Sequence, residues 1–487
     1  MGIIAKVKEF IANMFIKTAE KEFDVKVISS QTFELEQKKW NRIIKGKPDW
    51  LTKNVRTINF AKFICYYASK KTCMDLRIKV EGSERADYIE SCIKAMVDKS
   101  IRDKVEDACG LGGIIFKPSG SYNPNDAIDY ILPGDFVVTE KSSNGDIMGI
   151  IFFDRITKGK KYYTRLEYHH FESIISIDSG EAIRVYTIEN KAFVSRKDDD
   201  IGDVISLTDV EEWKNIEPIE SFSNVEKTLF GYFKMPSNNT FDYNSPEGVA
   251  IFSNCIEELK DLDIAWSRKS NEVDDSQHIT FIDETALTTI DQRTGQKGKL
   301  ELPRFVKGIK RGKIDAENVV DEHTATLLTT DRINDINSIL SMISTKSGFS
   351  QGQFVMDEKT GRVTATQIES DDNETIETIS DIRKSLKAAI KDLIYALDVY
   401  CDVRFDMPSG YVNALDEDVP DEDVFYFKDL LSTFEQDRAR AYQLMTMGVY
   451  SKRQYLKEYE GFSDEEVDNM MREIASEKEE KEGLFEE

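Results

Sequence analysis

Three stretches in the second half of the chain place apolar residues at steps of three and four, the spacing of one face of an α-helix. They cover residues 251–266, 333–343 and 376–400. An insert at 277–318 separates the first two stretches, and a glycine-bearing segment at 346–370 separates the second from the third. This order predicts a protruding helical hairpin with an insert at its tip and a loop at its base.

The first half of the chain changes from the helical period to the strand period. Segments 53–70 and 87–109 carry helical apolar faces. By contrast, 111–236 consists of β-branched and aromatic runs separated by turn signals such as Asn144-Gly145 and Asp178-Ser179-Gly180. The pattern predicts helices packed on a curled antiparallel sheet.

Both chain ends are predicted to be helical. Apolar residues between positions 3 and 14 share one face, which favours docking on a partner over binding to a membrane. After Tyr400 we expect two or three short helices, with Ser451 as an N-cap and Ser463 and Glu466 as a capping box.

Length and charge restrict the possible function classes. The 487 residues suffice for two to four folded regions, and 90 acidic against 65 basic residues give a net charge of −25. Since phosphate neutralisation supplies most of the affinity of non-specific DNA binding, this balance disfavours tight binding of nucleic acid. It leaves open weak contact with DNA, or passage of DNA along an acidic wall. Cysteine spacing indicates a reducing cytoplasmic environment, and no apolar run approaches the roughly 20 residues that span a bilayer.

Motifs for catalysis or metal binding are missing from the sequence. The run from Gly308 to Lys313 has the wrong glycine spacing for a P-loop, and no zinc-protease or serine-hydrolase motif occurs. His169 and His170 alternate along one predicted strand, so their rings face opposite sides and cannot share a metal. Acidic runs at 198–200 and 371–372 leave a metal-dependent nucleic-acid enzyme as the alternative hypothesis.

The insert carries a basic run that is unusual in so acidic a chain. Its members are Lys297, Lys299, Arg304, Lys307, Lys310, Arg311 and Lys313. One interpretation is a solvated strand edge that discourages aggregation. The other is an electrostatic patch for an acidic partner protein or nucleic acid. The loop that begins at Lys346 likewise allows two interpretations, a plain chain reversal or a segment that moves relative to its helices.

Several segments in consistent order resemble the portal proteins of tailed bacteriophages, in the subgroup common among long-tailed phages of Gram-positive hosts. The resemblance rests on WNRIIKGKPDWL (40–51), EDACGLGGIIFKP (106–118), YYTRLEYHHF (162–171), LFGYFKMPSNN (229–239), GRVTATQIESDDNETIETI (361–379) and the C-terminal run GVYSKRQYLKEYEGFSDEEVDNMMREIASE (448–477).

The resemblance implies an α+β portal fold with a helix and antiparallel-sheet wing, a two-helix stem with an α/β clip insert, a long helix and an α-helical crown. Mapped onto this sequence, its parts are an N-terminal arm and wing (1–245), a stem helix (246–276), the clip (277–318), a second stem helix (319–345), a tunnel loop (346–362), a long wing helix (363–400) and the crown (401–487).

The resemblance also implies a ring of usually twelve subunits at one vertex of the capsid. Such a ring conducts double-stranded DNA during packaging and ejection. It assembles in the host cytoplasm with scaffolding and major capsid proteins and docks the terminase and the head-completion or tail adaptor. The resemblance implies no enzyme activity, and we expect no catalytic residue, metal, cofactor or membrane.

Position within the portal pattern selects two sets of candidate residues. Those expected to contact DNA in the tunnel are Lys346, Lys359 and Arg362. Those expected to dock a partner at the clip are Arg304, Lys307, Lys310, Arg311 and Lys313.

Overall fold

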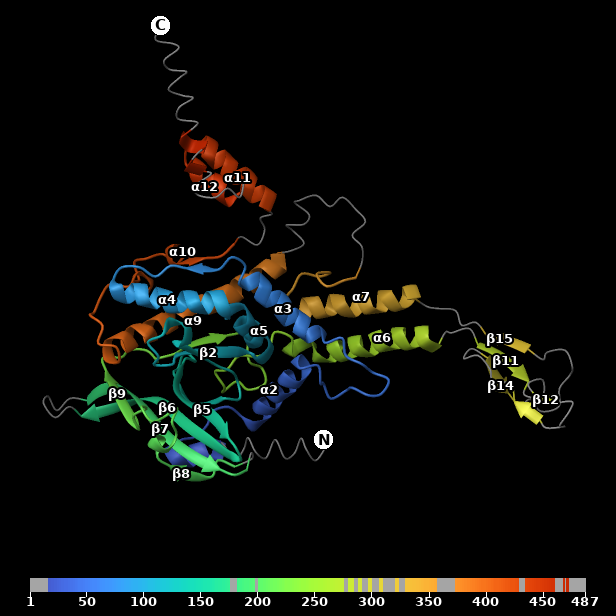
Figure 1. The fold of residues 1–487 in the computed structure, drawn as a ribbon, viewed down its shortest axis with the longest axis horizontal. Coiled ribbons are helices and arrows are strands. Elements are labelled where there is room, and N and C mark those ends of the chain that lie inside the picture. The colour runs from blue at the N-terminus through green and yellow to red at the C-terminus, as the bar shows by residue number, and fades with distance from the viewer. Residues whose placement is uncertain are drawn as a thin grey trace, which may run out of the picture. The chain divides into compact units, whose positions relative to one another are not determined.

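A computed structural model gives the fold, and its contacts divide the chain into two units, Met1–Phe427 and Lys428–Glu487, which are described separately (Figure 1). The described residues are 16–175, 182–197, 200–275, 279–283, 288–290, 297–299, 306–309, 320–323, 329–356, 373–428, 434–459, 467–468 and 470–472.

The first unit begins with helices whose ends follow local capping rules. After a helical segment at 16–23 come α2 (Gln31–Ile44), α3 (Phe60–Thr72), α4 (Glu84–Lys99) and α5 (Ile101–Leu111). The Ser30 side chain accepts a hydrogen bond from the Phe33 amide at the start of α2, and Ser83 does the same for Ala86 at the start of α4. The predicted helical segment 53–70 overlaps α3, which begins only at Phe60, and the predicted segment 87–109 is divided at Ser100 into α4 and α5.

The largest sheet is antiparallel and occupies the middle of the predicted β region. Its strands are β4 (Phe136–Lys141), β5 (Ile147–Lys158), β6 (Lys161–Ile175), β7 (Ala182–Ser195), β8 (Asp203–Ile205) and β9 (Ile219–Ser223). The order is β4-β5-β6-β7-β8, and β9 also pairs with β7. Gly145, at φ +92°, lies in the predicted turn between β4 and β5. The second predicted turn, at 178–180, lies outside the described residues.

A smaller sheet contacts α5 and the long helix α9 (Asn373–Val403), and its Ile115 shares a hydrophobic core with Phe136 and Ile150 of the large sheet. It consists of β2 (Gly113–Pro118), β3 (Ile128–Ile131) and β10 (Gly231–Lys234), in the antiparallel order β10-β2-β3. Helix α9 packs on β10 and β2 (Figure 1). Its buried face includes the predicted Ile379, Leu386, Ile390, Leu393, Leu397 and Tyr400.

A buried ionic cluster joins the two sheets. The Lys117 ammonium on β2 lies 2.7 Å from both carboxylate oxygens of Glu167 on β6. Arg165 and His169 also contact this carboxylate, at 3.0 and 2.8 Å. Burial alone would raise the pKa of Glu167, but the charges of Lys117 and Arg165 outweigh it and hold that pKa well below its usual value. Burial lowers the pKa of His169, which favours its neutral form.

The hairpin consists of α6 (Ile256–Asp275) and α7 (Thr329–Lys346), which lie side by side (Figure 1). Between them lie the strands β11 (Ile279–Asp283), β12 (Thr288–Ile290), β13 (Lys297–Lys299), β14 (Val306–Ile309) and β15 (Val320–His323). Strand β11 pairs in parallel with β14 and antiparallel with β15, and β12 pairs with β13.

One expected boundary is wrong. Residues 319–345 were expected to form the second stem helix, but 320–323 form β15, and α7 begins at Thr329. Val320–His323 pair antiparallel with Ile279–Ile282 of β11, so the insert reaches at least to His323. The first helix also begins late, because residues 253–255 form a single 3-10 turn before α6.

The chain between α9 and the second unit packs back onto the first unit. It contains a 3-10 turn at Asn413–Leu415, α10 (Asp421–Val424) and β16 (Phe425–Tyr426), which pairs with β1 (Arg77–Ile78). The division between the units therefore falls after Phe427 and not at residue 401. The second unit contains α11 (Phe434–Thr446) and α12 (Lys452–Glu458), with Ser451 at the N-cap position of α12; Ser463 and Glu466 lie outside the described residues.

The contact between α9 and β10 depends on a glycine. A Cβ atom added at Gly231 would lie 1.9 Å from the Ala389 carbonyl oxygen, so Gly231→Ala forces two backbones apart. We expect it to lower the free energy of unfolding by about 3 kcal/mol in chemical denaturation. Gly145→Ala is the control, because its Cβ meets open space and costs only the strain of a positive φ, about 1 kcal/mol. Equal losses in the two variants would contradict this account of the contact.

Candidate functional site

The hairpin and the loop that follows it form the candidate site. Two ion pairs fix the register of the helices: Lys346 pairs with Glu258 at one end, and Arg332 lies 2.9 Å from Glu272 at the other. The partners are separated by 14 residues on each helix (272 − 258 and 346 − 332), which corresponds to about 21 Å of helix. The two helices are therefore antiparallel and in register along this length.

The inner side of the hairpin is apolar, and the outer side of α7 is polar. Buried residues include Leu259, Leu262 and Ala265 of α6 and Ile336, Leu340 and Ile343 of α7. The predicted Trp266 is only half-buried. Exposed positions on α7 follow the helical spacing at Asp331, Asp335, Ser338, Met342 and Thr345. This exposed face presents two carboxylates, two hydroxyl groups and the side chain of Met342.

Residues 50–58 run along α6 and are held by a buried carboxylate. Asp263 is 3 % exposed and accepts hydrogen bonds from the Trp50 indole at 2.9 Å and from the Ile58 amide at 3.0 Å. The Ser267 hydroxyl accepts a bond from the Arg56 amide. Trp50 belongs to a segment that resembles the portal family, but the sequence did not indicate Asp263 as its partner, because the two residues lie 213 positions apart.

The first part of the predicted tunnel loop is packed against α9. Ser350 and Thr375 exchange hydrogen bonds: the Ser350 amide donates to Thr375 Oγ1 at 3.0 Å, and the Thr375 amide donates to Ser350 Oγ at 3.1 Å. Thr375 lies in the first turn of α9, where backbone amides have no partner within the helix. Ser350 thus caps α9 from outside the helix.

Aromatic contacts hold the same part of the loop against α3. Phe349 and Phe354 are buried and lie 5.3 Å apart, ring centre to ring centre. Phe354 also contacts Phe60, Phe63 and Tyr67 of α3 at 5.5 to 5.8 Å. Residues 347–356 therefore form a fixed turn.

Only some of the candidate residues lie in the described part of the chain. Lys346 is the last residue of α7, and its side chain is 41 % exposed beside Glu258. Lys359 and Arg362 lie outside the described residues. In the insert, Lys307 lies on β14, whereas Arg304, Lys310, Arg311 and Lys313 fall outside the described residues.

The two adjacent histidines have separate partners, as the strand pattern predicts. His169 is fully buried and contacts Glu167 and Tyr186, whereas His170 contacts Glu172. Of the acidic runs considered for a nuclease, 371–372 and most of 198–200 lie outside the described residues. None of the described helices combines the length and the apolar character that crossing a membrane requires.

A cavity of about 320 Å³ lies beside α2 and gathers three carboxyl groups, from Glu34, Asp135 and Glu247. Burial raises the pKa of all three. For Glu34, burial and the neighbouring Glu247 and Glu20 outweigh the opposing charge of Lys38 and raise the pKa from 4.5 to about 7. Glu247 accepts hydrogen bonds from Ser29 and Gln37 at 2.5 and 2.8 Å.

The Glu34 pKa predicts how stability depends on pH. Because its folded-state pKa exceeds the unfolded value, its contribution is fully present below about pH 4.5 and is lost as the pH rises through about 7. Glu34→Gln should flatten the fall in unfolding free energy between pH 5 and 8, and it should be more stable than the parent at pH 8. Chemical denaturation across this range measures the effect. Glu257→Gln, at an exposed position on α6, is the control and should parallel the parent. A Glu34→Gln profile that also parallels the parent would contradict the prediction.

One protein family matches most of the chain. A family model described as "Phage portal protein, SPP1 Gp6-like" matches residues 94–483. The chain belongs to this family of phage portal proteins. Comparison with curated proteins finds no match.

Two solved structures also align with much of the chain. A chain titled "Virion of native gene transfer agent (GTA) particle" has 10% identity and a TM-score of 0.37, covering 86% of this chain and 92% of that one. A chain from "Neck of native GTA particle computed with C12 symmetry" has 10% identity and a TM-score of 0.34, covering 82% and 88%. Portal membership therefore rests on the family match and not on these two likenesses.

Proposed function

We propose that this chain forms a closed ring of twelve subunits at one vertex of the capsid of a long-tailed phage of a Gram-positive host. Double-stranded DNA passes through the ring during packaging and ejection. The family match over residues 94–483 carries this proposal. A negative-stain image of the purified protein, viewed along the ring axis, tests it. A protein that stays monomeric under assembly conditions would overturn it.

The described elements support an assignment of parts. Helices α6 and α7 correspond to the stem, the strands between them to the clip, and the turn after α7 to the start of the tunnel loop. Helix α9 corresponds to the long wing helix, and the second unit to the core of the crown. In this assignment the ring is heterologous, so each subunit presents two different faces to its neighbours.

Charge gives the ring a physical means of passing DNA without holding it. Twelve chains of net charge −25 carry a formal −300, and the exposed face of α7 presents Asp331 and Asp335. Phosphates near such a wall are repelled, so tight binding by counterion release is avoided. A few lysines at the constriction then supply weak contacts that depend on no base sequence.

The partners follow from the same proposal. The ring assembles in the host cytoplasm with scaffolding and major capsid proteins, docks the terminase during packaging, and later holds the head-completion or tail adaptor. It performs no catalysis, and it ends in the virion as the connector between head and tail. Purified rings should therefore show no magnesium-dependent nuclease or ATPase activity.

Charge reversal tests the tunnel lysines. Lys346→Glu with Lys359→Glu should leave the ring intact, because an exposed ion pair such as Lys346–Glu258 contributes only about 0.2–1 kcal/mol. The variant should reduce the DNA packaged per capsid. Lys260→Glu with Lys384→Glu is the control of equal charge change, since the Lys260 side chain is also 41 % exposed and pairs with Glu257 on the same hairpin.

A charge swap separates the two roles of Lys346. Lys346→Glu combined with Glu258→Lys restores an ion pair between the helices but leaves a negative charge at position 346. If Lys346 acts on DNA, packaging by the swapped variant stays reduced. Full recovery would show that Lys346 serves only the hairpin.

Charge reversal also tests the clip. The triple variant Lys307→Glu, Lys310→Glu and Arg311→Glu should weaken binding of the terminase or head-completion protein to assembled rings, measured by co-sedimentation. The control reverses three exposed lysines outside the insert, Lys79, Lys227 and Lys384, and changes the net charge by the same amount. Equal binding by the two variants would return the basic run to the role of a solvated strand edge.

A further inference from the structure

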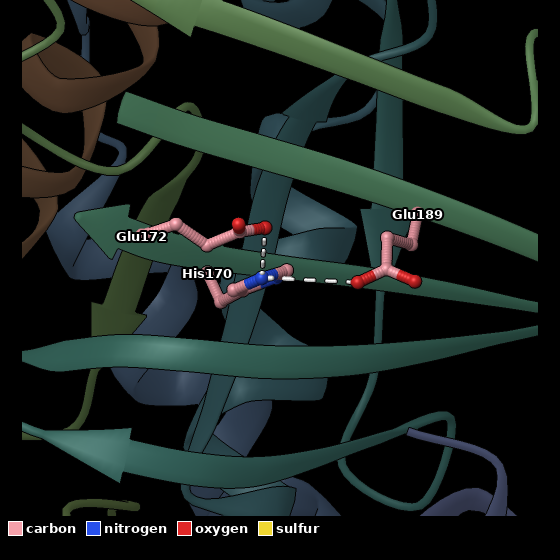
Figure 2. A group of neighbouring side chains, drawn as sticks. All are labelled: His170, Glu172 and Glu189. Carbon is pink, nitrogen blue, oxygen red and sulfur yellow. Dashed lines mark hydrogen bonds and ion pairs between the residues drawn. The ribbon is translucent and has the colours of Figure 1, made fainter. Parts of the chain in front are cut away.

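Three side chains converge on one face of strands β6 and β7, outside the hairpin. They are His170, Glu172 and Glu189 (Figure 2). We propose that they bind a divalent transition-metal cation of the zinc type. The site needs no ring and no DNA, so it stands independently of the proposed function. It also revises the expectation, drawn from the sequence, that the chain binds no metal.

Strand geometry brings the three ligands together. His170 and Glu172 are two residues apart on β6, so their side chains share a face. On β7, Glu189 lies opposite Tyr168, which is the neighbour of His170 on that same face. The pairing of β6 with β7 thus completes a set that neither strand contains alone.

The distances suit a small cation. His170 Nε2 lies 2.8 Å from one oxygen of Glu172 and 3.8 Å from one oxygen of Glu189, and the three ligand atoms lie within 4.8 Å of one another. Tetrahedral zinc with bonds near 2.1 Å places its ligands about 3.4 Å apart. The two observed distances lie on either side of this value. Closing the site around an ion requires the two glutamates to turn about their side-chain bonds.

Glu172 and Glu189 bring two negative charges to this face of the sheet. In the described part of the chain, no lysine or arginine forms an ion pair with Glu172 or Glu189. A bound dication would offset this repulsion and replace the single bond from His170 to Glu172 with bonds to both carboxylates.

Packing and burial restrain the His170 ring. Its ring stacks on Tyr168 with ring centres 4.1 Å apart, and the residue is only 9 % exposed. Figure 2 shows the ring edge pointing between the two carboxylates. One imidazole and two carboxylates favour zinc or a similar transition metal over calcium or magnesium, which prefer oxygen ligands alone.

The ligand set also indicates modest affinity. Histidines that bind metals usually donate their other ring nitrogen to an acceptor, and loss of that partner weakens binding about 10–100-fold. Among the described residues, none hydrogen-bonds to Nδ1 of His170. With three protein ligands, the fourth position is left to water, so the site would stabilise the β6–β7 pairing and exchange its metal readily.

Metal titration of the tag-free full chain tests the proposal, using ZnCl₂ and, as a spectroscopic probe, CoCl₂. We expect one ion of modest affinity per chain by calorimetry and visible cobalt absorption typical of four-coordinate N/O ligation. At a hundredfold excess over the dissociation constant, zinc should raise the melting temperature by about 3 °C. His170→Ala should abolish all three signals.

Two milder variants keep the test independent of folding. Glu189→Gln retains the size of the side chain and should weaken zinc binding at least tenfold. Glu140→Gln is the control, because it removes a nearby charge without removing a ligand. If both variants weaken binding equally, or if His170→Ala binds zinc as the parent does, the ion is attracted by diffuse charge and the proposed site is wrong.

Discussion

The carboxylate of Glu167 is buried between two sheets, and basic side chains from both sheets keep it charged. Lys117 reaches it from the three-stranded sheet, and Arg165 and His169 reach it from its own strand. Removing one partner of such a buried pair costs about 3–5 kcal/mol, because the other charge is left uncompensated. The same small sheet is pressed against α9 at Gly231. Because α9 packs on this sheet, its position depends on the contacts that hold the sheet. The turn after α7 caps α9, so its position depends on the same contacts.

Periodicity was enough to predict the elements that bury one face. The hairpin helices, α9 and the antiparallel region follow the 3.6 and 2.0 repeats closely, since burial of one face imposes the repeat. Periodicity did not predict the short strand Val320–His323, which pairs with β11, because four residues are too few to establish a period. The limit of the first unit was also misplaced, because β16 pairs with β1 across more than 300 residues of sequence.

The candidate site was only partly visible in the sequence for a related reason. Lys346 could be selected by position, but its pairing with Glu258 depends on the register of two helices. Ser350 looked like an ordinary loop residue until its exchange of hydrogen bonds with Thr375 was seen. His170 was dismissed together with His169, because the set with Glu189 exists only once β6 pairs with β7. Composition and spacing report on single segments, whereas these three features belong to pairs of segments.

The cap that Ser350 provides for α9 has a consequence for how this part of the chain can vary. Met356 donates its amide to Asn337 of α7, and Thr375 is held by Ser350, so the span from 357 to 372 leaves one anchored point and arrives at another. Neither anchor depends on the length of that span. Joining two fixed points by a chain of twice the length costs only about 0.6 kcal/mol more. Insertions and deletions there can therefore accumulate in evolution without shifting where α9 begins.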